Sequence, residues 1–407
     1  MMQAGFAKQS ITPKIGLPMA GYEGLRKSTG VLDELHVRCI YLKQEEEVFL
    51  FQYDLLYVDA TFCEQLSEHI CKKYGIKKEH VLINAIHTHS GPAQILDKTG
   101  INRRLDYIDG EYDEELVRFL LAQGILAAQQ AYDNCEEASL SFAQDHYQDI
   151  GTNRNQPDRL IDDMLSVLHI QTSSQKTALI FSYACHPTIF HEENSCYSCD
   201  LLGPAFEALE KEHEVAMFYN GACGDVSTRF TKKGSGRKEA KRLGLLLVDH
   251  VRETLGNLAP MQGELQISCF TFTCQTRTYP TVEKLQAYGK QLDTKTKEYE
   301  LYLLYEKMSC FLKNQRLSLP IHILHIHRLA YVYVPVELFS ALALYLKQQV
   351  KDQSVVLVGY AMDYYSYMPD QSAYHERPIG FEAVITPFEE GCGERLMDEI
   401  AMILHKE

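Results

Sequence analysis

Apolar residues recur along the chain in two patterns. Short runs of β-branched and aromatic residues are typical of strands, and longer segments with an apolar residue every three to four positions are typical of amphipathic helices. Strands are predicted at 2–9, 34–43, 47–54, 80–86, 138–146, 163–171, 176–184, 214–219, 262–275, 319–327, 329–334, 354–360 and 381–385. Helices are predicted at 58–74, 111–132, 201–212, 236–256, 280–315, 337–350 and 388–405.

The order of the predicted elements indicates the fold class. Strands and helices alternate through the first two thirds of the chain, which favours a mixed α/β fold. The strands at 34–43 and 47–54 are separated by a short acidic turn, so we expect them to pair as a hairpin. No segment rich in Pro, Gly or Ser divides the chain, and we therefore predict a single large domain over residues 1–407.

The segment 280–315 differs from the rest of the chain because it is highly charged and helical throughout. Its pattern predicts a helical hairpin interrupted near 293–297. We interpret it as a solvated surface excursion. An apolar cluster within it makes a lid or a dimer arm the alternative. The cluster consists of Leu301, Leu303, Leu304 and Tyr305.

Composition narrows the function classes. The chain has 407 residues, of which 45% are hydrophobic and 23% charged, a balance typical of globular proteins with a sizeable core. Its 40 basic and 55 acidic residues give a net charge of −15, which disfavours nucleic-acid binding and electrostatic adhesion to anionic lipid. No apolar run approaches the ~20 residues that span a bilayer. The first residues lack the pattern of a signal peptide, so we predict a cytoplasmic protein with reduced cysteines.

Two histidine blocks follow apolar strands. In VLINAIHTHSGPA at 81–93, His87 and His89 are two positions apart, and side chains at that spacing share one face of a strand. In TALIFSYACHPTIF at 177–190, His186 again follows a strand and precedes a proline. Strand ends are where α/β enzymes place their chemistry, and imidazole nitrogen is a common ligand of zinc. The repeated pattern favours a shared metal site, with histidines that merely cap the core as the alternative.

Three further segments place polar groups after strands. NGACGDVS ends in Ser227, a candidate nucleophile or hydrogen-bond donor in a glycine-rich loop. Glu337 in VPVEL is either an oxygen ligand or a carboxylate favoured at a helix N-terminus. The loop 358–374 carries several tyrosines, whose hydroxyls can bind a metal or an oxyanion, or which form an aromatic surface loop.

Taken together, these segments resemble the neutral ceramidase family. The likeness rests on AGFAKQSITPKIGLPMAGY at 4–22, HTHSGP, NGACGDVS, the PVEL block and the GYA–Y–Y–P block, which occur in the family's order. It extends over nearly the whole chain, from residue 4 to residue 386. The resemblance implies the family's mixed α/β catalytic domain. It also implies a zinc-dependent amidohydrolase that cleaves the N-acyl bond of ceramide into a fatty acid and sphingosine, and thus a place in sphingolipid metabolism.

The same resemblance implies roles for single residues. One zinc ion per chain is expected, and it would activate the water that attacks the amide. The implied zinc ligands are His87, His186, Glu337 and Tyr367, with Tyr364 as the alternative tyrosine. The implied catalytic residues are His89 beside the metal, Arg154 for contact with the reacting group, and Ser227 in the active site. Our mechanistic hypothesis is that His89 transfers a proton and that Ser227 orients the substrate, with a nucleophilic Ser227 as the alternative.

The chain also departs from the family pattern. Phe381 stands where the family has a tyrosine that holds the substrate carbonyl, so that donor is either missing or supplied by Tyr374. Thr228 and Arg229 follow GDVS in place of Pro-Asn. We expect no C-terminal immunoglobulin-like domain. These departures leave the expected zinc centre intact but make another N-acyl compound an alternative to ceramide as the substrate.

Two alternatives remain beside the amidohydrolase. One is a metal hydrolase that uses the same histidines on a phosphoester or a lactone. The other is a homologue that binds ligand without catalysis, which Phe381 would favour. The expected partner is a small N-acyl lipid or amide; peripheral membrane contact and a homo-oligomer stay open.

Overall fold

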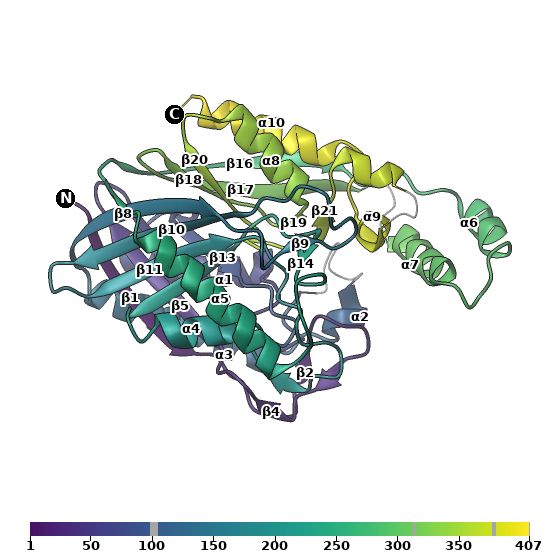
Figure 1. Cartoon of the computed structure of the whole chain (residues 1–407), viewed down its shortest axis with the longest axis horizontal. Helices are drawn as coiled ribbons and strands as arrows, with labels where there is room; N and C mark the ends of the chain where they lie inside the picture. Colours follow the sequence, from purple (N-terminus) through teal and green to yellow (C-terminus); the bar gives the residue numbers. More distant parts are fainter. Residues whose placement is uncertain (98–104, 312–314, 377–379, 407) are drawn as a thin grey trace.

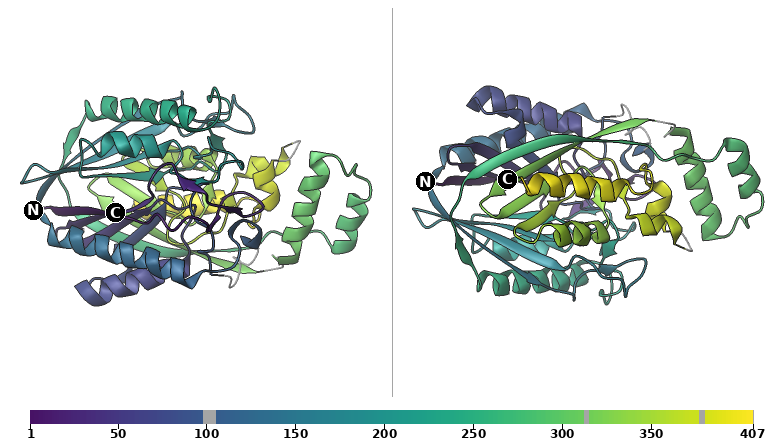
Figure 2. Two further views of the ribbon diagram at one scale, coloured as in Figure 1. Left: turned by 90° about the horizontal axis from the view of Figure 1, so that it is seen from below. Right: turned by 90° about the horizontal axis from the view of Figure 1, so that it is seen from above.

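The computed structural model describes residues 1–97, 105–311, 315–376 and 380–406, which form two β-sheets and the helices packed on them (Figure 1). The predicted mixed α/β fold is confirmed. Both chain termini lie at one end of the molecule, and a helical hairpin projects from the other end (Figure 2). In the described part of the chain, no helix combines the length and the apolar composition needed to cross a bilayer.

The larger sheet has nine strands in the order β13-β11-β10-β8-β1-β5-β6-β7, with β15 paired to β8. Strand β7 is parallel to β6, and β13 is parallel to β11. The antiparallel pairing of β5 with β6 confirms the predicted hairpin. The strands are β1 (Gln3–Ser10), β5 (His36–Lys43), β6 (Glu47–Tyr53), β7 (Val81–Ala85), β8 (Glu136–His146), β10 (Met164–Thr172), β11 (Thr177–Tyr183), β13 (Val215–Asn220) and β15 (Ala259–Met261).

Four helices pack against this sheet, with α1 and α3 on one side of the molecule and α4 and α5 on the other (Figure 2). The side chain of Asp59 caps α1 by accepting from the N–H of Phe62, and Gly75 ends it with a φ of 76° that few other residues adopt. Asp113 caps α3 in the same way. The helices are α1 (Ala60–Tyr74), α3 (Glu114–Asp133), α4 (Leu202–Leu209) and α5 (Arg237–Leu255).

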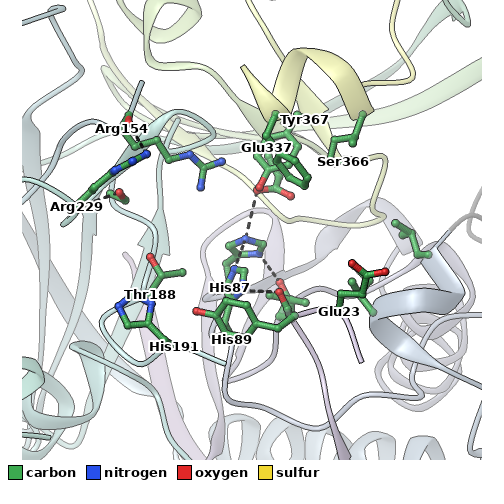
Figure 3. A pocket seen from close by; sticks show the side chains of 18 of the residues that line it. Glu23, His87, His89, Arg154, Thr188, His191, Arg229, Glu337, Ser366 and Tyr367 are labelled. Atoms are coloured by element: carbon green, nitrogen blue, oxygen red, sulfur yellow. Dashed lines mark hydrogen bonds and ion pairs between the residues drawn. The ribbon is translucent and has the colours of Figure 1, made fainter. Parts of the chain in front are cut away.

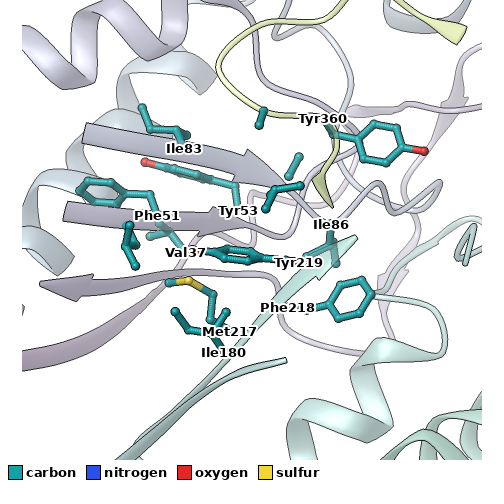
Figure 4. Packing of buried hydrophobic residues seen from close by; sticks show 14 of the residues in the cluster. Val37, Phe51, Tyr53, Ile83, Ile86, Ile180, Met217, Phe218, Tyr219 and Tyr360 are labelled. Atoms are coloured by element: carbon teal, nitrogen blue, oxygen red, sulfur yellow. The ribbon is translucent and has the colours of Figure 1, made fainter. Parts of the chain in front are cut away.

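The second sheet has four strands and is sandwiched between the first sheet and two helices. Its side chains alternate, since Leu324 and Tyr331 join the core of the first sheet whereas Ile323 and Val332 pack under the helices. The hydroxyl of Tyr333 donates to that of Tyr219 in the first sheet at 2.7 Å. Figure 4 shows the core of the first sheet, with Tyr219 and Tyr360 among its residues. The elements are β16 (Leu265–Gln275), β17 (Arg316–Ile326), β18 (Leu329–Tyr333), β20 (Ser354–Val358), α8 (Ser340–Gln349) and α10 (Cys392–Leu404).

Short elements form the loops between the sheets. They include four two-residue strand pairs, one short helix and two 3-10 turns within the described residues. The strand pairs are β2 (Pro18–Met19) with β3 (Arg26–Lys27), β4 (Gly30–Val31) with β12 (Cys196–Tyr197), β9 (Thr152–Asn153) with β14 (Val226–Ser227), and β19 (Glu337–Leu338) with β21 (Tyr367–Met368). The others are α2 (Asp106–Asp109), η1 (Lys78–His80) and η3 (Gln371–His375).

The predicted hairpin at 280–315 is present as α6 (Val282–Gly289) and α7 (Lys297–Phe311). It is more than a solvated excursion, because Leu301, Leu304 and Tyr305 of α7 pack on the short helix α9 (Phe381–Ile385). The prediction of a strand at 381–385 is wrong, because these residues form the helix α9. Its β-branched residues are helical here because Val384 and Ile385 face this cluster, so tertiary packing outweighs local propensity.

A buried ion-pair network holds the end of β6. Nη1 of Arg38, a residue 1% exposed, donates to both oxygens of Asp54 at 3.0 Å, and Nε donates to Glu210 at 2.7 Å. The carboxylate of Asp54 also accepts from the N–H of His36. Because Asp54 directly follows β6, this network fixes the backbone that leads to Leu56, whose carbonyl contacts the candidate site.

Replacing Arg38 by Met leaves Asp54 buried without its counter-charge and should lower the free energy of unfolding by about 3–5 kcal/mol. Lys8→Met removes a cation from the same Glu210, but Lys8 is 37% exposed, so the loss should stay below about 1 kcal/mol. Urea unfolding followed by circular dichroism compares the two variants. Equal losses would contradict a structural role for the buried pair.

Candidate metal centre and its pocket

The two histidine blocks meet because each follows the end of a strand in the first sheet, β7 in one case and β11 in the other. His87 follows β7 and His186 follows β11, and both side chains are buried. The Nε2 atoms of His87 and His186 lie 3.1 Å apart, and Nε2 of His89 lies 3.3 Å from that of His87. The predicted convergence of the three imidazoles is thus present.

The route to this convergence differs from the prediction. Strand β7 ends at Ala85, so His87 and His89 do not share the face of a strand. His87 instead has a φ of 69°, a left-handed conformation that is uncommon outside glycine. A turn, held by a hydrogen bond from the N–H of His87 to the carbonyl of Leu55, aims both rings at one point.

The strand pair β19–β21, whose first strand follows β18 of the second sheet, contributes a carboxylate to the same point. Oε2 of Glu337 lies 3.3 Å from Nε2 of His87 (Figure 3) and 3.1 Å from Nε2 of His186. Strands β19 and β21 are parallel, and Glu337 is the direct register partner of Tyr367. The VPVEL segment and the tyrosine-rich loop, which are separate in the sequence, therefore lie side by side at the centre.

Backbone carbonyls fix the orientation of the three imidazoles. The Nδ1 atoms contact carbonyl oxygens of Leu56 for His87 at 2.9 Å, Gly21 for His89 at 2.9 Å, and Cys223 for His186 at 2.6 Å. A carbonyl only accepts, so each Nδ1 carries the proton and each Nε2 presents a lone pair. The three Nε2 atoms and the carboxylate of Glu337 therefore face one another, an orientation in which all four can bind one cation.

Burial favours the neutral form of two of these imidazoles. It lowers the pKa of His186 to about 4 and that of His89 well below its usual range. Burial alone would raise the pKa of Glu337, but the neighbouring His87 and His186 outweigh it and lower that pKa. Neutral imidazoles with a carboxylate suit zinc, whose tetrahedral ligands are about 3.3 Å apart at ordinary bond lengths. The residues present fit a metal ion.

Three tyrosines surround the carboxylate of Glu337. Tyr364 donates to its Oε1, and the hydroxyl of Tyr360 lies 3.3 Å from Oε2. The ring of Tyr360 stacks on His87 with centroids 3.9 Å apart. The ring of Tyr367 is nearly parallel to that of His186 at 6.3 Å. The structure thus brings both predicted tyrosines, Tyr364 and Tyr367, to the site. It adds Tyr360, which sequence reasoning missed although the residue lies in the quoted GYA block.

Arg154 extends into the pocket beside the centre (Figure 3). Its Nε lies 2.6 Å from Oε1 of Glu382, its Nη2 donates to the carbonyl of Gly224 at 2.7 Å, and its guanidinium lies over the ring of Tyr367. Burial works against its charge, but these neighbours keep the pKa of Arg154 above its usual value. Glu382 was not predicted; it follows Phe381 directly, and nothing in the local pattern marks it as the partner of a distant arginine.

The structure places Ser227 at the pocket and Tyr374 away from it. Ser227 lines the pocket and is paired with His186 through a backbone bridge. Tyr374 is not among the described residues that line the pocket, because its hydroxyl donates to the carbonyl of Phe388 at 2.9 Å. The predicted substitution of Tyr374 for the missing hydroxyl at Phe381 therefore has no support from its position. Phe381 itself lines the pocket.

The pocket above the centre has a volume of about 490 Å³. The candidate ligands His87, His89 and Glu337 line it together with Arg154 and Ser227. The rest of the lining includes an apolar set that comes from several segments, one of them α7. The apolar residues are Leu56, Leu105, Ile108, Leu304, Phe381 and Ile385. The site combines a metal-suited donor set with space for an amphipathic molecule.

Comparison with known proteins identifies similar folds and sequences. The family model described as neutral/alkaline non-lysosomal ceramidase, N-terminal, matches residues 2–238. A search of curated proteins gives no significant match. The crystal structure of neutral ceramidase from Pseudomonas aeruginosa aligns with a TM-score of 0.81 at 19% identity, over 99% of this chain and 74% of that chain. A structure described as ceramidase complexed with C2 gives a TM-score of 0.81 at 18% identity, over 100% of this chain and 75% of that one.

Zinc titration tests the donor set directly. Protein stripped with a chelator should bind about one zinc ion per chain, and His186→Ala should weaken binding at least about a hundredfold because it removes a converging lone pair. His191→Ala is the matched control, since His191 lines the same pocket outside the cluster. Calorimetry measures both variants. Unchanged affinity in His186→Ala would show that the ligand assignment is wrong.

Proposed function

Because the chain belongs to the neutral/alkaline non-lysosomal ceramidase family, we propose that it hydrolyses the amide bond of ceramide or a related N-acyl lipid to a fatty acid and a free amine. The observation that carries the proposal is the buried convergence of three imidazole lone pairs and a carboxylate beside Arg154. Such a centre, beside a pocket that admits an acyl chain, suits the metal-assisted hydrolysis of a linear amide.

We propose that one zinc ion binds His87, His186 and Glu337, with Tyr367 as the fourth ligand implied by the family resemblance. Zinc in such a donor set supplies Lewis acidity, which polarises a carbonyl and makes water a better nucleophile. His89, whose Nε2 also reaches the centre, is the residue assigned to proton transfer.

His89 is suited to proton transfer by its orientation. Its Nδ1 is held by the carbonyl of Gly21, so Nε2 is free to accept a proton from water and to deliver it to the leaving amine nitrogen. Gly21 is required for this contact because a Cβ there would lie 2.7 Å from Nδ1 of His89, and its φ of 100° disfavours other residues. The pair therefore fixes the proton carrier beside the scissile bond.

Arg154 is suited to stabilise the carbonyl oxygen as it gains negative charge. Glu382 and the carbonyl of Gly224 hold the guanidinium in place before the substrate arrives. Donors that are fixed in advance contribute more than donors that must reorganise. Arg154 thereby supplies an oxyanion contact on the side where Phe381 has no hydroxyl. Ser227 lines the pocket and orients the substrate.

We also infer that residues 1–407 act as one catalytic domain. The histidines follow strands of the first sheet, whereas Glu337 and Tyr367 lie on the strand pair β19–β21 beyond the second sheet, so no single sheet holds the proposed centre. The cytoplasmic location, the membrane contact and the homo-oligomer stay predictions. Subcellular fractionation, vesicle co-sedimentation and light scattering check them in turn.

Metal-loaded protein should release sphingosine and fatty acid in equal amounts from a short-chain ceramide. Arg154→Ala should lower kcat by about 10²- to 10³-fold, because it removes a preorganised charge, while zinc affinity is unchanged. Arg159→Ala is the matched control, since Arg159 forms ion pairs with Asp370 and Glu376 and does not line the pocket among the described residues.

The same assay separates the alternatives. Turnover of phosphoesters or lactones without amide cleavage would favour the other metal hydrolases. Binding of N-acyl lipid without turnover of any of these substrates would favour a silent homologue, for which the missing hydroxyl of Phe381 is the structural reason. Products are quantified by chromatography of the free amine, phosphate or ring-opened acid.

A second pair of variants tests the apolar wall. Leu304→Gln places a polar group in the pocket lining and should raise KM for a long-chain substrate about tenfold. Leu303→Gln makes the same change one residue away, where the side chain is 46% exposed, and should leave KM within about twofold. Steady-state kinetics with acyl chains of increasing length measure both. Equal effects would argue against a role of α7 in substrate binding.

A further inference from the structure

Two cations outside the proposed catalytic set line the same pocket. Arg229 and Lys232 lie in the loop between β14 and α5, with Arg229 exposed and Lys232 half-buried. Figure 3 shows Arg229 on the side of the pocket that also carries Arg154 and His191, with the imidazoles of the centre between this side and Glu23. The pocket therefore has one cationic side.

The side-chain hydrogen bonds of Arg229 and Lys232 to other described residues go to a carbonyl oxygen and an imidazole nitrogen, and not to a carboxylate. Nη1 of Arg229 donates to the carbonyl of Arg154 at 3.3 Å, and its guanidinium lies over the ring of Phe230. Nζ of Lys232 donates to Nε2 of His191 at 2.8 Å. Within the described part of the chain, no carboxylate lies in an ion pair with Arg229 or Lys232.

Among the described residues, three other charged groups line the pocket besides the histidines, namely Arg154, Glu337 and Glu23, and Glu23 lies on the far side of the imidazoles from Arg229 (Figure 3). Arg154 is paired with Glu382, and Glu337 belongs to the donor set for the cation. Arg229 and Lys232 therefore concentrate positive charge on one side of the pocket, although the whole chain has a net charge of −15. Positive charge concentrated in a pocket with apolar walls attracts and orients anionic ligands.

The backbone places Arg229 next to the reaction centre. Its N–H donates to Oγ of Ser227, whose backbone is bridged to His186. If the amide of a substrate lies at the centre, one half of that substrate can therefore contact the cationic side of the pocket. The apolar residues of the lining, such as Leu304 and Ile385, remain for the acyl half.

We propose that the preferred substrate is an N-acyl amphiphile whose amine half carries an anionic oxyacid group, which binds Arg229 and Lys232. This inference rests on the proposed amide hydrolysis and specifies its substrate class. In the reaction the oxygen of water forms a bond to the acyl carbon, the C–N bond breaks, and the amine nitrogen takes up a proton. The products are a fatty acid and an anionic free amine, with no change of oxidation state.

Three substrates with one acyl chain test the inference. N-dodecanoylethanolamine is neutral, its O-phosphate ester adds a phosphate, and N-dodecanoylglycine carries a carboxylate. For the zinc-loaded full-length protein, kcat/KM should be at least about tenfold higher for an anionic substrate than for the neutral one, since a charge-assisted contact contributes that much. The two anionic substrates distinguish phosphate from carboxylate.

Charge-removing variants locate the effect. Arg229→Gln and Lys232→Gln should each lower kcat/KM about fivefold for the anionic substrates, a value that allows for partial solvent exposure, and change it less than about twofold for the neutral one. Lys233→Gln is the matched control, because Lys233 is adjacent and exposed and does not line the pocket among the described residues. Added salt should weaken only the reactions of the anionic substrates.

The possible results separate the two proposals. Equal or faster cleavage of the neutral substrate overturns this inference and leaves amide hydrolysis intact. An effect of Lys233→Gln as large as that of Lys232→Gln also overturns it, because the charge would then act without a specific contact. If no amide is cleaved, amide hydrolysis fails. Calorimetric affinity for the three compounds then decides the inference, with tighter binding of the anionic ones supporting it and equal binding refuting it.

Discussion

The organisation of this protein follows from one electrostatic constraint, the burial of four electron-pair donors that face one another. Nε2 of His87 and Nε2 of His186 lie within 3.3 Å of Oε2 of Glu337. Burying polar nitrogen and oxygen atoms costs folding free energy, so the arrangement depends on the hydrogen bond that holds each ring through its Nδ1 atom. Backbone carbonyls at Leu56 and Cys223 provide that support. The buried Arg38–Asp54 pair in turn fixes the segment that ends in Leu56.

The constraint also explains why two sheets are needed. Strand ends of the larger sheet present the histidines, but the carboxylate arrives on β19, which follows β18 of the smaller sheet. Packing between the sheets, including the buried hydrogen bond between Tyr333 and Tyr219, sets the distance between the two halves of the centre. A change that loosens this packing would separate Glu337 from the imidazoles and affect stability and metal affinity together.

Much of this arrangement was predictable because it has local causes. Periodicity predicts the strands before His87 and His186, and imidazole at two strand ends indicates a shared site. The parts that were missed depend on contacts between distant segments. The left-handed turn at His87, the stacking of Tyr360 and the pairing of Glu382 with Arg154 leave no local pattern. Tyr374 was placed by analogy, but the carbonyl of Phe388 holds its hydroxyl elsewhere.

The five-residue helix α9 links the pocket mouth to the reaction centre. Its Glu382 holds Arg154, and its Ile385 packs with Leu304 of α7. Helix α7 has 15 residues, a length at which an isolated helix is marginal in water, so its position depends on this contact. A ligand that displaces Leu304 would therefore act on α9 and, through Glu382, on the guanidinium of Arg154. In the proposed reaction, this chain of contacts would couple the length and shape of the acyl chain to the position of Arg154.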